Sequence, residues 1–390
     1  MTAIRLAPAL AVAIAAAFVV PSMSSAAGGN AGDDAILHAS WRGFVSAYIA
    51  PDGAVRRPEH DDDTVSEGQA YAMLRAAWMN DRPVFDRVWQ WTREHLIKAG
   101  DGNDGLLAWH WERSGGSGHV TDWNFASDAD ADYAFALILA SRRWKPGDGG
   151  RAADGYLQEA RRILALLLNR ATAPDREGIV MWLPGSWADE RAEHRGLVLN
   201  PSYFAPAWFR IFNEVTGDAR WLQLADSSYV VLRAVCGRSS RSLRVVPDWI
   251  RWQSASEWTL RDDRDPVSSW DAVRVPWRVG TDRLWFHTQA ARLFLDGCLE
   301  PLVRTQRSGL AVELTASGEI VGGRDHPLAN AMYWFAVSAA AGRDRLIDRV
   351  RQHAVWAAGP SLSFGDGRHY YVDSLAYLPF LARTGRYAAR

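Results

Sequence analysis

A glutamate lies on the apolar face of a predicted helix in the segment TVSEGQAYAMLRAAW, residues 64–78. Helical spacing puts Glu67 on the same face as Tyr71 and Trp78. Burial among apolar groups raises the pKa of a carboxyl, so such a glutamate can stay protonated and donate at neutral pH. Thr64 and Glu67 also have the spacing of a capping box, in which the glutamate only completes the helix start. The segment therefore predicts either a general acid or a helix cap.

Three aspartates alternate at the start of a second predicted helix, in NFASDADADYAFALILASRRW, residues 124–144. An aspartate at a helix start usually caps the first turn, but Asp128, Asp130 and Asp132 together exceed what capping requires. Their spacing also resembles the start of a calcium loop, although the glycine and the terminal glutamate of such a loop are absent. The stretch indicates chemistry beyond capping, with calcium binding as the alternative.

Two further stretches contain groups that could handle a water molecule. In SSWDAVRVPWRVGTD, residues 268–282, Arg274 follows Asp271 by one helical turn and can pair with it. A paired aspartate stays ionised, as a base that activates water must, although a purely structural ion pair is the alternative. In VLNPSYFAPAWFRIF, residues 198–212, the phenol of Tyr203 could pack in the core or hydrogen-bond a water or sugar hydroxyl.

These candidates must be positioned by helices, because apolar residues recur at helical spacing along most of the chain. About a dozen helices are predicted, at 33–49, 64–79, 82–98, 129–144, 154–171, 202–215, 219–236, 270–280, 284–299, 327–340, 343–357 and 370–384. Strands are predicted only at 178–183 and, as a hairpin, at 310–323. Such helices bury their apolar stripes in a solenoid, a bundle or a closed double ring, and connectors of uneven length favour the ring.

The composition fits a folded, exported protein with an uncharged partner. The chain has 390 residues, 48% of them apolar, and a formal net charge of -1, so no field of one sign favours nucleic acid or an anionic membrane. Residues 1–26 read as a signal peptide, with an uncleaved anchor as the alternative, and 27–390 as one catalytic domain. Cys236 and Cys298 are the only cysteines, which allows one disulfide or two free thiols.

Tryptophan is unusually abundant, with 20 residues, several of them in or beside segments rich in Gly, Asp and Ser. Most tryptophans in proteins belong to the core, but an exposed indole face suits the C–H face of a sugar ring. The pattern therefore hints at a carbohydrate ligand. Candidates for stacking along a groove are Trp109, Trp111, Trp123 and Trp277.

Taken together, four ordered segments resemble glycoside hydrolase family 8, a family of endo-acting cellulases, lichenases, chitosanases and some xylanases. The segments are VSEGQAYAML, ASDADADYAFALILASRRW, NPSYFAPAWF and SSWDAVRVPWRVG, within a resemblance that spans residues 35–385. Tyr133 departs from the second segment, where the family usually has Ile or Met. VPDWIRW, residues 246–252, is similar to a segment of the cellulases encoded with bacterial cellulose synthesis.

The resemblance implies an all-α (α/α)6 barrel of about twelve helices, with a small β-hairpin and an open substrate groove at one end. It implies that Glu67 is the general acid and Asp271 the general base of an inverting reaction, without cofactor or metal. Asp128 would hold the sugar at the cleavage site with Asp130 beside it. Tyr203 and Arg274 would orient the attacking water and the base.

The expected function is that of an exported endo-β-1,4-glucanase, periplasmic or secreted, that cleaves cellulose-type chains. We expect a monomer that is not an integral membrane protein, has no nucleic-acid partner and is associated with a cellulose secretion machinery. Endo-xylanase or chitosanase activity is the alternative within the family, although the near-neutral charge does not favour the cationic polymer chitosan. A glucan-binding protein without catalysis is the alternative from another class.

Overall fold

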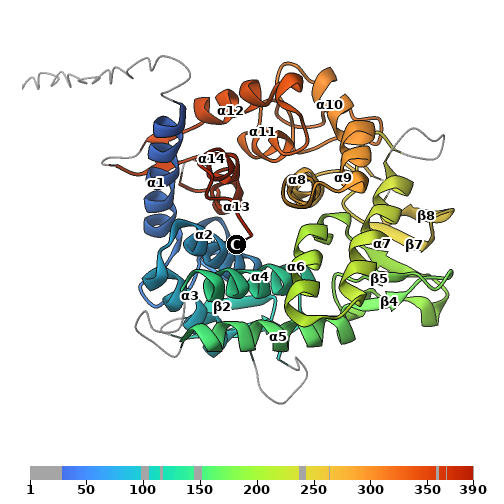
Figure 1. Ribbon diagram of the computed structural model, residues 1–390, viewed down its shortest axis with the longest axis horizontal. Helices are drawn as coiled ribbons and strands as arrows, with labels where there is room; N and C mark the ends of the chain where they lie inside the picture. Colours follow the sequence, from blue (N-terminus) through green and yellow to red (C-terminus); the bar gives the residue numbers. More distant parts are fainter. Residues whose placement is uncertain are drawn as a thin grey trace, which may run out of the picture.

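The computed structural model describes residues 29–97, 105–114, 117–144, 152–236, 243–262, 264–356, 360–365 and 367–389. Over these residues the chain is mainly helical, and its helices form two concentric rings (Figure 1). The predicted signal peptide lies outside the described residues and stays a prediction. No described helix is both long and apolar enough to cross a membrane.

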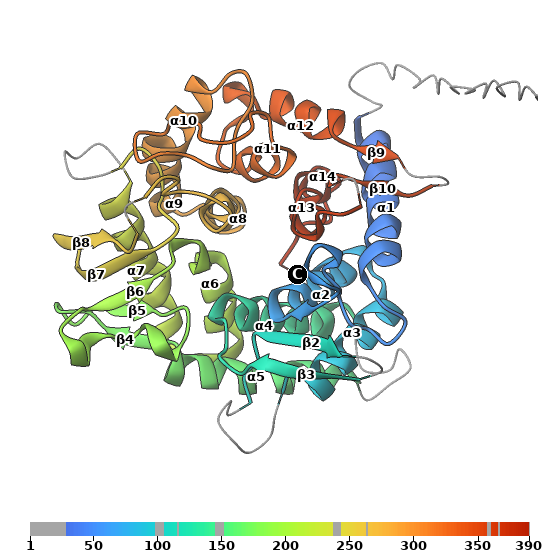
Figure 2. The ribbon, with the colours of Figure 1, turned by 180° about the vertical axis from the view of Figure 1, so that it is seen from behind.

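The chain alternates between an outer and an inner ring of helices, as Figures 1 and 2 show from opposite sides. The outer ring contains α1 (Gly29–Tyr48), α3 (Arg82–His95), α5 (Ala152–Arg170), α7 (Arg220–Val235), α9 (Gln289–Phe294) continued by η6 (Leu295–Leu299) and α10 (Glu300–Thr305), and α12 (Arg343–Gln352). The inner ring contains α2 (Ser66–Met79), α4 (Ser127–Arg143), α6 (Pro206–Thr216), α8 (Val275–Phe286), α11 (Pro327–Trp334), and α13 (Tyr370–Leu375) with α14 (Leu378–Arg383). The predicted (α/α)6 barrel is confirmed.

Burial distinguishes the two rings. The outer helix α3 is amphipathic and buries Val84, Phe85, Val88 and Trp91 on one face. All residues of the inner helix α2 are buried except Glu67. A half-buried carboxyl in an otherwise buried helix needs a reason other than solubility.

The capping-box interpretation of Glu67 is wrong. The helix α2 begins after Val65, which is its N-cap and makes no side-chain capping bond. Thr64 instead belongs to the short strand β1 (Thr64–Val65), where it is fully buried. The Glu67 side chain is therefore not committed to closing the helix start.

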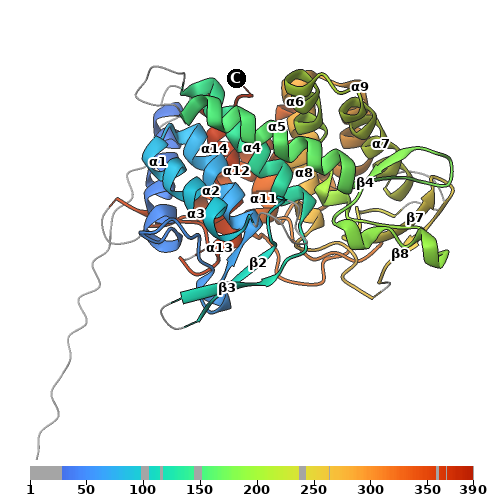
Figure 3. The same cartoon turned by 90° about the horizontal axis from the view of Figure 1, so that it is seen from below.

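The two three-stranded sheets lie on one face of the ring, away from the C-terminal end of the chain (Figure 3). One sheet has the order β1, β2 (His110–Ser114), β3 (Ser117–Asp122), and another has the order β6 (Leu197–Leu199), β7 (Ile250–Ser254), β8 (Glu257–Leu260). Two-stranded sheets pair β4 (Thr172–Pro174) with β5 (Val180–Trp182) and β9 (Val355–Trp356) with β10 (Leu362–Ser363). All these pairs are antiparallel.

The strand predictions succeeded only in part. The segment 178–183 contains β5, but 310–323 forms isolated bridges, Leu314 with Ile320 and with Ser268, instead of a regular hairpin. The hairpin β2–β3 and the sheet β6–β8 were missed, because strands this short carry too few alternating positions for a clear period.

Buried polar and aromatic groups tie the inner helices together. On α4, Asp132 accepts two hydrogen bonds from Arg278 of α8, at 2.6 and 2.7 Å, and one from the indole of Trp208 of α6. Both ionic side chains are almost fully buried. Towards the C-terminal end of the chain, Tyr387 packs on Trp78 and accepts a hydrogen bond from the Trp277 indole. Aromatic packing therefore fills the ring on this side.

Two outer helical segments are covalently linked. Cys236, at the end of α7, forms a disulfide with Cys298 in η6, across a sequence separation of 62 residues. The alternative of two free thiols is wrong.

We expect Asp132→Ala to destabilise the protein strongly, because it leaves the buried Arg278 guanidinium without its counter-ion. Breaking one side of a buried pair costs about 3–5 kcal/mol, which urea unfolding of the purified variant can measure. The matched control is Asp262→Ala, which removes an exposed partner of Arg264 and should leave the unfolding midpoint nearly unchanged. Equal stability of the two variants would contradict this account.

Candidate active site

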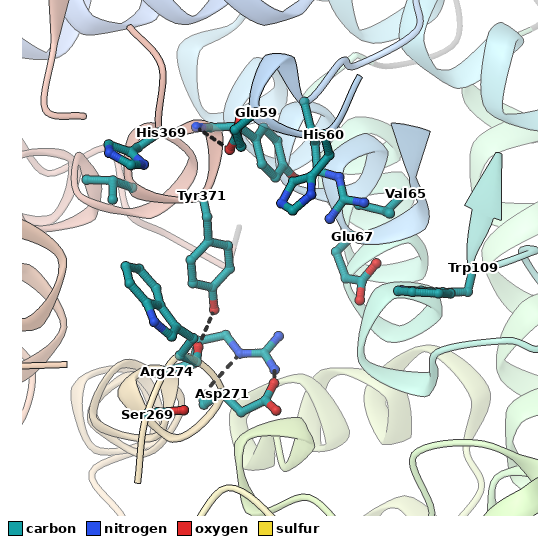
Figure 4. Close-up of a pocket in the computed structure, with 14 residues that line it drawn as sticks. Glu59, His60, Val65, Glu67, Trp109, Ser269, Asp271, Arg274, His369 and Tyr371 are labelled. Carbon is teal, nitrogen blue, oxygen red and sulfur yellow. Dashed lines mark hydrogen bonds and ion pairs between the residues drawn. The ribbon is translucent and has the colours of Figure 1, made fainter. Parts of the chain in front are cut away.

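The predicted acid and base line the same pocket. This cavity has a volume of about 420 Å³, and its walls include Glu67, Asp271, Arg274, Trp109 and Tyr371. Figure 4 shows Glu67 and Asp271 entering the same opening from different elements. The structure therefore brings together two carboxyl groups that are separated by more than half of the chain.

The pocket lies where several inner helices begin. Glu67 is in the first turn of α2, Asp128 is in the first turn of α4, and Tyr370 opens α13. Asp271 precedes η5 (Ala272–Arg274), which leads directly into α8. Because helix N-termini carry partial positive charge, this end of the barrel favours acidic side chains.

The helices α2 and α13 approach closely next to Glu67. The residue after it is Gly68, and a Cβ atom there would lie only 2.7 Å from the phenol oxygen of Tyr370. Glycine is unfavourable within a helix, so its presence here reflects the need for α13 to pack against α2. Tyr370 and Glu67 therefore line the same pocket.

The surroundings of Glu67 favour its protonated form. Burial, and after it the negative charge of Asp128, raise the pKa of Glu67 to about 7, while Arg274 and Arg57 oppose the rise. A carboxyl with this pKa keeps its proton at slightly acid pH and can still release it near neutrality. This is the property required of a general acid.

Asp271 is held differently. One of its oxygens accepts a hydrogen bond from Nη2 of Arg274 at 2.9 Å, and the other accepts one from the indole Nε1 of Trp249 at 2.9 Å. About a third of its side chain stays exposed. Asp248 supports the turn, because its Oδ1 accepts the backbone N–H groups of Ser269 and Ala272. The carboxylate is thus fixed in orientation and open to a water molecule.

Arg274 joins four elements through one buried guanidinium. Its Nη1 donates to Asp128 of α4 at 2.6 Å and to the phenol of Tyr71 of α2 at 3.1 Å. Its Nη2 donates to Ser202 of η4 (Pro201–Tyr203) at 2.7 Å and to Asp271. The predicted pairing of Arg274 with Asp271 is confirmed, and the arginine also fixes Asp128.

The alternating aspartates have three different partners. Asp128 is buried below the pocket against Arg274, and its contact with a sugar stays a prediction. Asp130 is fully buried, and its Oδ1 accepts the backbone N–H of Leu107, so the prediction that it binds substrate is wrong. Both oxygens of Asp132 are occupied by Arg278, which does not suit the calcium interpretation.

Tyr203 lies beside the catalytic candidates. Its ring is 5.3 Å from the Arg274 guanidinium and 6.0 Å from the Trp249 ring. Burial and then the charges of Asp128 and Glu67 raise its pKa well above the usual range, so its phenol keeps its proton and can donate. Its action on the attacking water stays a prediction.

The four tryptophan candidates divide by exposure. Trp109 lines the pocket and is 37% exposed, so its face is available. Trp123 is 39% exposed just beyond β3 but is not among the residues that line the pocket. The predictions for Trp111 and Trp277 are wrong, because both indoles are buried, the first against Trp91 and the second against Tyr387.

Sequence reasoning also missed residues of the site. Trp270, 43% exposed, and Tyr371 line the pocket, and the Tyr371 phenol donates to the Trp270 carbonyl at 3.0 Å. Trp249 lies in the segment VPDWIRW but was not predicted as a site residue. Its only signal would have been its position in that segment, since its hydrogen bond to Asp271 depends on the tertiary fold.

Residues 8–295 match the family model described as glycosyl hydrolases family 8. The chain belongs to glycosyl hydrolase family 8. Among curated family relatives, endoglucanase A of Acetivibrio thermocellus is 31% identical over 363 residues, covering 90% of this chain and 70% of that protein. The endoglucanase of Escherichia coli K12 is 32% identical over 250 residues, covering 62% of this chain and 61% of that protein. The chain spans about half of two further relatives, with 53% of each covered.

Solved structures agree on the fold. The β-1,3-1,4-glucanase of Paenibacillus sp. X4 superposes with a TM-score of 0.76 at 21% identity, over 95% of each chain. The endo-β-1,4-glucanase CMCax of Acetobacter xylinum gives 0.71 at 23% identity, over 91% of this chain and 100% of that one. The family membership inferred from the four sequence segments is confirmed.

We expect Trp249→Phe to lower hydrolytic turnover by about tenfold or more with little change in KM, because it removes one of the two donors that hold Asp271. Steady-state kinetics on a soluble glucan would measure the effect. Trp187→Phe is the matched control, since this exposed indole packs near Trp249 but makes no described hydrogen bond to Asp271. The same loss in both variants would argue for a packing effect instead.

Proposed function

We propose that the chain is an inverting endo-β-1,4-glucanase that hydrolyses cellulose-type chains, with Glu67 as general acid and Asp271 as general base. One observation carries the proposal: in a family 8 chain, two carboxyl groups with opposite surroundings face one pocket. Glu67 is shielded and has a pKa of about 7. Asp271 is partly exposed and fixed by two N–H donors.

The reaction needs one proton given and one proton taken. Glu67 donates its proton to the glycosidic oxygen as the bond from that oxygen to the anomeric carbon breaks. A water held at Asp271 gives its proton to the carboxylate, and its oxygen bonds to the anomeric carbon from the opposite face. The product therefore has the inverted configuration. Solvent then returns a proton to Glu67 and removes one from Asp271.

Arg274 and Tyr203 support the base. The guanidinium fixes Asp271 and, on its other side, neutralises Asp128, so the charge of Asp128 is held below the pocket. Tyr203, whose phenol stays protonated, would donate a hydrogen bond to the attacking water. Both would position reactants instead of exchanging protons with the sugar.

The aromatic walls and the relatives support a neutral glucan as substrate. Trp109, Trp270 and Tyr371 present aromatic surface to the pocket, which suits the apolar faces of pyranose rings. Several curated relatives carry the name endoglucanase, among them that of Cellulomonas uda, 31% identical over 239 residues. Xylan and chitosan are the competing substrates within the family, and binding without cleavage is the competing function.

We also propose that the chain is exported. Its first 26 residues have the pattern of a signal peptide, and the Cys236–Cys298 disulfide suits an oxidising compartment. Mass spectrometry of the mature protein from the periplasm and the medium should find its N-terminus near residue 27. An association with a cellulose secretion machinery, and the monomeric state, stay predictions.

We expect Glu67→Gln and Asp271→Asn each to reduce kcat on β-1,4-glucan by about 10²–10⁴-fold, because each removes one proton transfer. The assay measures reducing ends released from carboxymethyl-cellulose, mixed-linkage glucan, xylan and chitosan, and NMR of early products reports the anomer. Unchanged thermal unfolding would show that both variants fold. Binding of glucan by the wild type without release of reducing ends would favour the non-catalytic alternative.

The pH dependence of kcat/KM should fall off above a pH of about 7, the pKa of Glu67. The direction follows from the role: the acid must be protonated, and it loses its proton as the pH rises through its pKa. Rates measured at low substrate concentration report groups of the free enzyme, which is the state described here. A profile that stays level through neutral pH would be incompatible with Glu67 as the acid.

A further inference from the structure

Arg57 lines the pocket with Glu67 and is held in place by residues that lie outside the pocket. Arg57 donates to both oxygens of Asp63, from Nε at 2.7 Å and from Nη2 at 2.5 Å. Nε2 of His110 donates to the second of these oxygens at 2.7 Å, and Nδ1 of His110 contacts the Thr121 hydroxyl at 2.6 Å. Asp63 and His110 are largely buried. The guanidinium is therefore held in one orientation.

The clamp joins the β2–β3 hairpin to the start of α2. His110 is in β2 and Thr121 in β3, while Asp63 directly precedes β1. The backbone adds to this connection, because the Ser66 N–H donates to the Trp109 carbonyl at 3.0 Å. Arg57 and Glu67 are thus fixed relative to each other by contacts on both sides of β1.

Several charged or titratable groups act on Glu67. They are Asp128 and Asp130 of α4, Arg274 of η5, Tyr203 of η4, Tyr370 of α13, and Arg57 just before η1 (Pro58–His60). Glu59, His60, Asp271 and His369 also line the pocket. Among the described arginines acting on Glu67, Arg274 is shared by two carboxylates, whereas Arg57 is paired with Asp63 alone.

We propose that Arg57 is a positioning residue for Glu67: the clamp formed by Asp63 and His110 fixes its positive charge beside the carboxyl that gives up the proton. This inference rests on the proposed function of Glu67 as the acid. A positive charge stabilises the carboxylate left after proton transfer and so counteracts burial and Asp128. Without it, Glu67 would hold its proton more tightly and donate it less readily.

Removing the charge of Arg57 and removing that of Asp63 should shift the pH profile in opposite directions. Arg57→Met removes the positive charge, so the alkaline limb of kcat/KM should move up by about 0.5–1 pH unit. Asp63→Asn leaves the Arg57 charge without its counter-ion, so the limb should move down by a similar amount. Arg57→Lys should bring the limb back towards the wild-type position. A purely structural loosening of the pocket would not give shifts of opposite sign.

The experiment measures full pH profiles of these variants on a soluble glucan, with thermal unfolding as a check on folding. The control is Arg220→Met, which breaks an exposed pair with Asp218 far from the pocket residues and should leave the limb in place. If Glu67→Gln inactivates the enzyme but Arg57→Met does not move the limb, the inference is overturned and the proposed function stands. If the wild type releases no sugar from any glucan, both the inference on Arg57 and the proposed function are wrong.

Discussion

The catalytic end of the barrel depends on one buried guanidinium. Arg274 would be costly to remove from water if its donors were not matched, yet its partners Tyr71, Asp128, Ser202 and Asp271 come from four separate elements. The elements α2, α4 and η4 bring Tyr71, Asp128 and Ser202 to Arg274 from other parts of the chain, whereas Asp271 lies one turn before it. Packing of these elements around Arg274 therefore assembles the site.

This arrangement also separates the roles of the carboxyl groups. Arg274 forms ion pairs with Asp128 and Asp271, while Glu67 makes no ion pair among the described residues. Three acids at one end of a barrel would otherwise repel one another and share protons without distinction. The pKa of about 7 for Glu67 results first from burial and then from the negative charge of Asp128, which Arg274 and Arg57 offset in part.

What the sequence could predict was local, and what it missed depends on closure of the ring. The long apolar periods of α2 and α4 predicted helices, and the family segments predicted the pocket residues Glu67, Asp271 and Arg274. The pocket residue Trp109 was predicted from the abundance of tryptophan. The exposure of an indole was not predictable from its type alone, because Trp277 and Trp109, both predicted to stack on sugar, occupy the core and the pocket. Likewise, nothing in the Asp-x-Asp-x-Asp spacing says which aspartate meets which arginine.

The β2–β3 hairpin and the residue just before it connect the wall of the pocket to the clamp on Arg57. Trp109 lines the pocket, and the ring of its neighbour His110 lies 5.2 Å from the Trp109 ring and contacts Asp63, which belongs to the clamp on Arg57. A sugar ring stacked on Trp109 would therefore rest on the same stretch of backbone that holds the charge beside Glu67. Any displacement of the hairpin would therefore change substrate contact and acid strength together.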